Sequence, residues 1–169
     1  MDRIVIKNYS LPDKPSELIN MALKNLNQCL KDDNYHVDMF YFHTYFMGEN
    51  KCHVCLAGSV FAKTMKAGTN ESMAWKLMEY PNEKNKLYAL DDFRNGNIIQ
   101  GLKLAFSDPL KKINEKEIFK IKEKYKQGSD HNLVANLLIE EGNESFKARY
   151  KELRKRMKNL ASDFKKVGL

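Results

Sequence analysis

An almost continuous apolar stretch runs from Cys52 to Met65 and reads CHVCLAGSVFAKTM. Lys63 is its one charged residue, so a helix over this stretch would be apolar on nearly every side and would belong in the middle of a domain. Gly58 and Ser59 are unfavourable inside helices, which indicates a place where another backbone approaches closely. The sequence therefore predicts a buried central helix over 52–65, with Gly58 as a close-contact position.

The rest of the chain has the composition of a globular protein and mostly helical spacing. Of its 169 residues, 43% are hydrophobic and 30% are charged, which are globular values. A weak alternation from Ile4 to Ile6 is a candidate short β element, and the aromatic-rich segment 35–46 fits either a strand or a short helix. We predict a mainly α fold, a compact helical domain with a long C-terminal amphipathic helix. Residues 1–107 would form the core domain around the central helix, and 108–169 a basic helical region that can equally belong to the same domain.

Cys52 and Cys55 have the C-x-x-C spacing of half a zinc site or of a redox pair. A structural zinc site needs two more ligands, and the chain has no second C-x-x-C and no H-x-x-x-H. His36, His43 and His131 are isolated in sequence. We therefore expect no metal and no cofactor, with Cys52 and Cys55 as the weak metal candidates.

Cys55 is also a candidate nucleophile. A thiol in the first turn of a helix has a lowered pKa, because the helix dipole stabilises the thiolate. His43 or His36 could act as the base, oriented by Asp38 or Asn50. Cysteine is, however, among the residues most often buried in cores, so these catalytic candidates stay secondary and the question of an enzyme stays open, leaning towards none.

Two short motifs carry a resemblance. Cys55 to Gly58 reads C-L-A-G, and Leu87 to Gly96 follows the pattern L-x-A-L-x-x-x-R-x-G. This arrangement resembles small uncharacterised phage and bacterial proteins with a Cys-x-Ala-Gly helix after an aromatic segment. The resemblance covers about residues 36–100. It implies a phage or accessory gene product and attaches no activity to it.

The positive charge lies in the C-terminal part of the chain. Residues 1–100 hold 12 Lys+Arg and 12 Asp+Glu, whereas residues 101–169 hold 17 and 10, which is the whole net charge of +7. Helices and Gly turns over 115–158 look like a helix-turn-helix module, whose last helix would contact phosphates. The candidate binding residues are Lys147, Arg149, Lys151, Arg154, Lys155, Arg156 and Lys158.

The same C-terminal helix carries a seam of apolar residues at alternating steps of four and three. Its members are Phe146, Tyr150, Leu153, Met157, Leu160, Phe164 and Val167. This heptad pattern is typical of a coiled coil. The seam could fold back on the chain's own core, but its strict spacing favours pairing with a second copy and predicts a homodimer.

These patterns lead to three functional hypotheses. The first is a non-enzymatic, phage-encoded accessory protein that binds a host macromolecule stoichiometrically, as an inhibitor or adaptor, with an anti-defence role among the options. The second is a nucleic-acid-binding protein, and the third is a cysteine-dependent hydrolase or transferase that uses Cys55. We expect a cytoplasmic protein without a membrane partner, because no apolar run reaches the ~20 residues of a membrane span and three cysteines do not form a disulfide framework.

Overall fold

The computed structural model describes residues 10–37, 43–61, 80–126 and 144–169. The fold is mainly helical, as predicted. The elements are α1 (Pro15–Cys29), β1 (Tyr35–Val37), β2 (His43–Phe46), β3 (Lys51–Val54), the 3-10 helix η1 (Gly58–Phe61), α3 (Pro81–Arg94), α4 (Ile98–Ala105), α5 (Ser107–Leu110), α6 (Glu115–Tyr125) and α8 (Glu144–Lys166). The candidate β element at 4–6 lies outside these ranges. Within them, no helix has both the length and the apolar character needed to cross a membrane.

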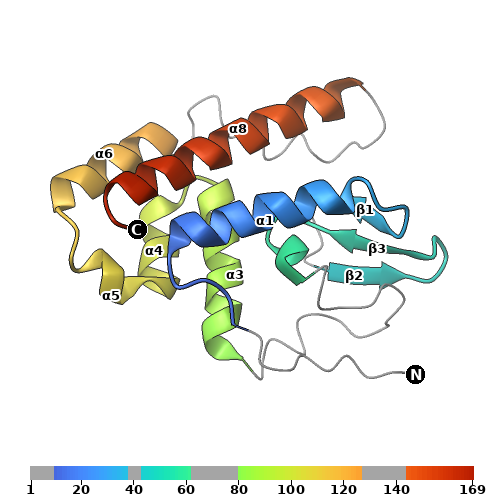
Figure 1. Cartoon of the computed structure of the whole chain (residues 1–169), viewed down its shortest axis with the longest axis horizontal. Helices are drawn as coiled ribbons and strands as arrows, with labels where there is room; N and C mark the ends of the chain where they lie inside the picture. Colours follow the sequence, from blue (N-terminus) through green and yellow to red (C-terminus); the bar gives the residue numbers. More distant parts are fainter. Residues whose placement is uncertain (1–9, 38–42, 62–79, 127–143) are drawn as a thin grey trace.

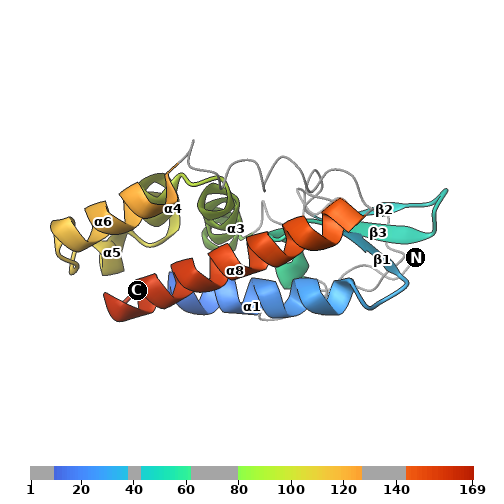
Figure 2. The ribbon, with the colours of Figure 1, turned by 90° about the horizontal axis from the view of Figure 1, so that it is seen from above.

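Helices α1 and α8 lie side by side and run in opposite directions along the length of the molecule (Figures 1 and 2). Pro15 occupies the first turn of α1, where its missing N–H is tolerated. The two helices are tied where α1 begins and the chain ends, because the Ser16 hydroxyl donates a hydrogen bond to the carbonyl of Leu169. The buried face of α1 consists of Leu18, Ile19, Ala22, Leu23 and Leu26, as its apolar spacing predicts.

A small sheet lies at one end of this helix pair, and α4, α5 and α6 lie at the other (Figure 1). The strand order is β1-β3-β2, with β3 parallel to β1 and antiparallel to β2. A four-residue turn from Met47 to Asn50 joins β2 to β3, and Asn50 adopts a positive φ of 53°, which Asn tolerates better than most residues. The aromatic segment 35–46 thus provides two strands in its described parts.

The predicted helix over 52–65 is wrong in its described part, 52–61, and residues 62–65 lie outside the described ranges. Cys52 to Val54 belong to strand β3, a turn follows, and helical geometry begins only at Gly58 as a single 3-10 turn. A short apolar run that is buried on both faces has no periodicity that distinguishes a strand from a helix. Here the segment forms a strand because it follows a hairpin turn and pairs with β1 and β2. Burial of the segment is nevertheless observed, because every residue from Cys52 to Val60 is buried.

The C-terminal seam packs inside the chain rather than presenting itself to a second copy. Leu153 is 1% exposed, and Met157, Leu160 and Phe164 are fully buried against the same hydrophobic cluster as α1. The ring of Phe164 contacts that of Phe93 in α3, with 5.2 Å between centroids. The four seam residues from Leu153 to Phe164 are therefore not available as an interface to a second copy. One hydrophobic cluster also spans the regions on both sides of residue 107.

Candidate functional site

The end of the molecule formed by α4, α5 and α6 carries a hollow in its surface. These three helices follow one another in the chain, separated by tight turns. The Asn114 side chain caps α6 by accepting a hydrogen bond from the Lys116 N–H at 2.9 Å. Asn97 at the start of α4 makes no such cap hydrogen bond.

The hollow has a volume of about 550 Å³ and an apolar floor. Its apolar residues are Ile99, Leu110, Ile113, Ile118 and Phe119. Ile118 is buried, whereas the Phe119 ring is 58% exposed, although burying such a ring stabilises a protein by about 2 kcal/mol. An exposed aromatic ring beside an apolar hollow marks a surface suited to contact with another molecule.

Lysines dominate the rim of this hollow. Lys103, Lys111 and Lys122 are exposed and line it together with one acidic residue, Glu115. The Nζ of Lys122 lies 5.4 Å from the centroid of the Phe119 ring, within the range of a cation–π contact. With Ser107, the five apolar residues and these four charged residues make up the ten-residue lining of the hollow, which we call the α4–α6 groove. It is apolar at its base and positive at its edge.

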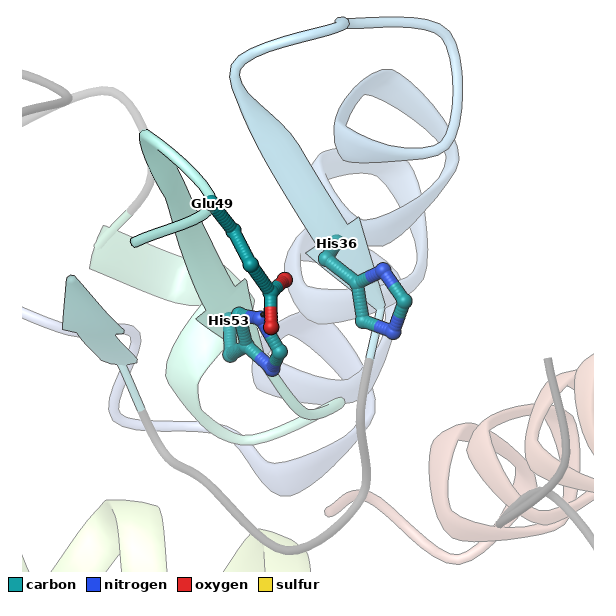
Figure 3. A group of neighbouring side chains, drawn as sticks. All are labelled: His36, Glu49 and His53. Carbon is teal, nitrogen blue, oxygen red and sulfur yellow. Dashed lines mark hydrogen bonds and ion pairs between the residues drawn. The ribbon is translucent and has the colours of Figure 1, made fainter. Parts of the chain in front are cut away.

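A second cluster of functional side chains lies on the sheet. His36 on β1 is directly opposite His53 on β3, and their rings stack with 4.4 Å between centroids. Glu49, in the turn before β3, places its Oε2 2.8 Å from the Nε2 of His53 (Figure 3). His53 is 6% exposed, while the Glu49 side chain is 54% exposed. Phe46 packs on the His53 ring from the neighbouring strand.

The cysteine candidates have the surroundings of core residues. Cys29, Cys52 and Cys55 are all buried and reduced. Burial raises the pKa of the Cys55 thiol to about 11, although the backbone N–H of Gly58, which donates to its sulfur at 3.3 Å, acts in the opposite direction. The premise of a lowered pKa at a helix N-terminus is therefore wrong, because Cys55 follows a strand and its thiolate is disfavoured. His43 lies on β2, paired in register with Val54, and Asp38 lies outside the described residues.

The predicted basic surface is only partly present. Lys151, Lys155 and Lys158 are exposed on α8, while Arg154 is half-buried. Arg156 is 4% exposed and donates to the carbonyl of Tyr125 at 3.0 Å, so it faces the protein interior and cannot contact phosphates. Lys147, Arg149 and Phe146 lie in the first turns of α8, where the structure describes the backbone but not the side chains.

No family model, no curated protein and no solved structure gives a significant match to this chain.

Sequence reasoning missed both the α4–α6 groove and the pairing of His53 with Glu49. The groove is assembled from three elements, each of which carries only ordinary amphipathic spacing. The histidine cluster did leave a signal, because the Gly48 turn between an aromatic segment and K-C-H-V is typical of a β-hairpin. A hairpin there would have placed Glu49 in the turn and His53 on the strand that follows it.

Proposed function

We propose that this chain is a non-enzymatic binding protein that binds an acidic amphipathic segment of a partner protein in the α4–α6 groove. The observation that carries the proposal is the exposed Phe119 ring beside an apolar hollow with a lysine rim. A helix that places apolar residues at i, i+3, i+4 and i+7 in a hydrophobic groove is a recurring mode of peptide recognition.

The chemistry of the groove selects the partner. Three lysines against one glutamate on the rim favour acidic side chains that flank the apolar anchors of the partner. Lys111 and Lys122 have acidic neighbours of their own, with Nζ distances of 3.1 Å to Asp108 and 3.8 Å to Glu123. These pairs are exposed and therefore weak, so an acidic partner can compete with them.

The resemblance of the 55–58 and 87–96 motifs to phage and bacterial proteins supports a host protein as the partner and a phage-encoded accessory protein as the binder. Under this proposal the protein acts by occupying its target, as an inhibitor or adaptor in the host cytoplasm. The raised pKa of the Cys55 thiol makes the cysteine-dependent enzyme the least supported alternative. Nucleic-acid binding rests on the exposed lysines of α8 and is resolved by the experiment that follows.

The test is a selection of peptides from a random library on the immobilised protein, followed by affinity measurements in solution. We expect the selected peptides to combine acidic residues with apolar residues at helical spacing. Phe119→Glu should weaken their binding about tenfold or more, because a central aromatic residue commonly dominates an interface. Tyr88→Glu is the matched control, since Tyr88 is another exposed aromatic residue on a different helix, 42% exposed.

Equal weakening by both variants, or no weakening by Phe119→Glu, would refute the groove as the binding site. Duplex DNA of random sequence serves as the competing probe. If DNA binds with a steep salt dependence and Lys151→Glu with Lys155→Glu abolishes that binding, then the nucleic-acid function replaces the peptide function.

A further inference from the structure

Two histidines and one glutamate from separate segments meet on the small sheet. His36, Glu49 and His53 each offer one ligand atom, and these atoms all lie within 4.8 Å of one another (Figure 3). Neutral imidazole nitrogens with one carboxylate oxygen are a donor set that zinc binds, with a fourth position left for water. We propose that these three residues form a binding site for a divalent transition-metal ion of the zinc type, independent of the α4–α6 groove.

The sheet register builds the site. His36 and His53 are directly opposed on the parallel strands β1 and β3, and directly opposed residues on neighbouring strands have Cβ atoms about 5 Å apart. The two side chains therefore project from the same face of the sheet, as their stacked rings show. Phe46 covers the His53 ring at 4.2 Å between centroids, which restricts its orientation.

The hairpin turn supplies the third ligand. The Glu49 N–H donates to the carbonyl of Phe46 at 3.2 Å, and the positive φ of Asn50 returns the chain into β3. This turn holds the Glu49 carboxylate 2.8 Å from the Nε2 of His53. Because the Glu49 side chain is 54% exposed, an ion can reach the cluster from solvent while His53 anchors it from the buried side.

The geometry requires only side-chain adjustment to hold an ion. Ligand atoms bound to one tetrahedral zinc at 2.0–2.2 Å lie roughly 3.3 Å apart, so the widest separation in the cluster must shrink by up to roughly 1.5 Å. Rotation of His36 and Glu49 about their side-chain bonds covers that distance without moving the strands. A bound ion would cross-link β1, β3 and the β2–β3 turn, in addition to the ring contacts and hydrogen bonds between them.

Magnesium and calcium fit the cluster poorly, because both prefer all-oxygen ligand sets. Among the described residues, the cluster that brings three such ligand atoms together does not include Cys52 or Cys55. Metal binding by the thiols and metal binding by the imidazoles can therefore be distinguished by absorption spectroscopy. Thiolate ligation produces a sulfur-to-metal charge-transfer band in the cobalt-substituted protein, whereas nitrogen and oxygen ligation produces only the d–d absorption of tetrahedral cobalt.

The experiment titrates chelator-treated protein with Zn²⁺ in a calorimeter and with Co²⁺ in a spectrophotometer. We expect one equivalent to bind, with d–d absorption and no charge-transfer band. A saturating excess of Zn²⁺ should raise the melting temperature by roughly 5 °C, whereas Mg²⁺ should leave it unchanged. Glu49→Gln, which keeps the shape of the side chain and removes its charge, should weaken Zn²⁺ binding about tenfold or more.

Further variants separate loss of ligation from loss of folding. His36→Gln should weaken binding to a similar extent, and circular dichroism should show both variants folded before metal is added. Glu152→Gln, an exposed carboxylate on α8, is the matched control and should bind Zn²⁺ like the wild type. Binding at millimolar concentration only, unchanged affinity in Glu49→Gln and His36→Gln, or a thiolate charge-transfer band would each overturn the proposal.

Discussion

Gly101 in α4 lies directly against the ring of Phe93 in α3. A Cβ on Gly101 would lie 2.7 Å from Cε1 of Phe93 and 3.0 Å from the carbonyl oxygen of Ala89. The Phe93 ring is fully buried and packs on Phe106 and Phe164, so it has little room to move away. A close approach between two helices is therefore found where α3 meets α4, whereas the close contact expected at Gly58 stays a prediction.

The first prediction follows from this contact. Gly101→Ala should lower the free energy of unfolding by up to about 2 kcal/mol, because overpacking costs about 1–3 kcal/mol and the better helix propensity of Ala offsets about 1 kcal/mol of it. Urea denaturation measures the difference. Gly48→Ala is the control, since nothing lies within 4 Å of a Cβ there. A stabilised Gly101→Ala variant would mean that α3 and α4 are not in this contact.

The second prediction concerns the pH dependence of stability at Asp163. Burial raises the pKa of this carboxyl, but hydrogen bonds from Lys124, Lys166 and Tyr125 outweigh burial and lower the pKa to about 2. The unfolded value is near 3.8, so the ionised carboxylate stabilises the fold above that pH, and its contribution disappears as the pH falls towards 2. Asp163→Asn should therefore lose about 1–2 kcal/mol at neutral pH.

Denaturation of the wild type and of Asp163→Asn at several pH values tests this. The difference between them should shrink as the pH falls from about 4 to about 2. Asp108→Asn is the matched control, because Asp108 also pairs with a lysine but is 86% exposed at its side chain. Its effect should stay within about 0.5 kcal/mol at every pH. A pH-independent loss in Asp163→Asn would point to packing rather than to charge.

Start signals and apolar spacing, such as Pro15 and the buried positions of α1, can be read from the sequence because they act within one segment. The sequence did not assign Cys52–Val54 to a strand, because that assignment depends on pairing with other segments. One partner, β1, lies well before it in the chain, and the other, β2, is joined to it through the hairpin turn. Six of the seam residues, from Phe146 to Phe164, lie on α8 and Val167 follows its end, but periodicity does not say which surface covers a seam. The α4–α6 groove and the His36–His53 pair depend on tertiary placement and left no regular spacing to detect.

The third prediction concerns the seam residues Leu153 and Leu160, and it is the opposite of what a coiled-coil dimer would show. A coiled-coil dimer would yield a folded monomer after Leu153→Lys with Leu160→Lys. Both side chains are instead buried within one chain, and burying an unpaired ammonium group costs several kcal/mol. The double variant should therefore fail to fold, as judged by circular dichroism, whereas Lys151→Ala with Lys158→Ala on the exposed face should melt within a few degrees of the wild type. A folded double variant that sediments as half the mass of the wild type would restore the dimer.

The last prediction tests the thiols and, with them, the remaining enzyme hypothesis. Burial raises the pKa of Cys55 to about 11 and that of Cys29 to about 12. Since only the thiolate attacks iodoacetamide, a thiol pKa raised from 9.0 to about 11 lowers the reactive fraction at neutral pH by about 100-fold, and burial also blocks access. Native protein should therefore label at least about 100-fold more slowly than the same protein in urea, where all three cysteines become accessible. Mass spectrometry of tryptic peptides assigns the labelled positions.

Rapid labelling of Cys55 in native protein near pH 6.5, with Cys29 still protected, would show an activated thiol and would favour the cysteine-dependent enzyme over the binding protein.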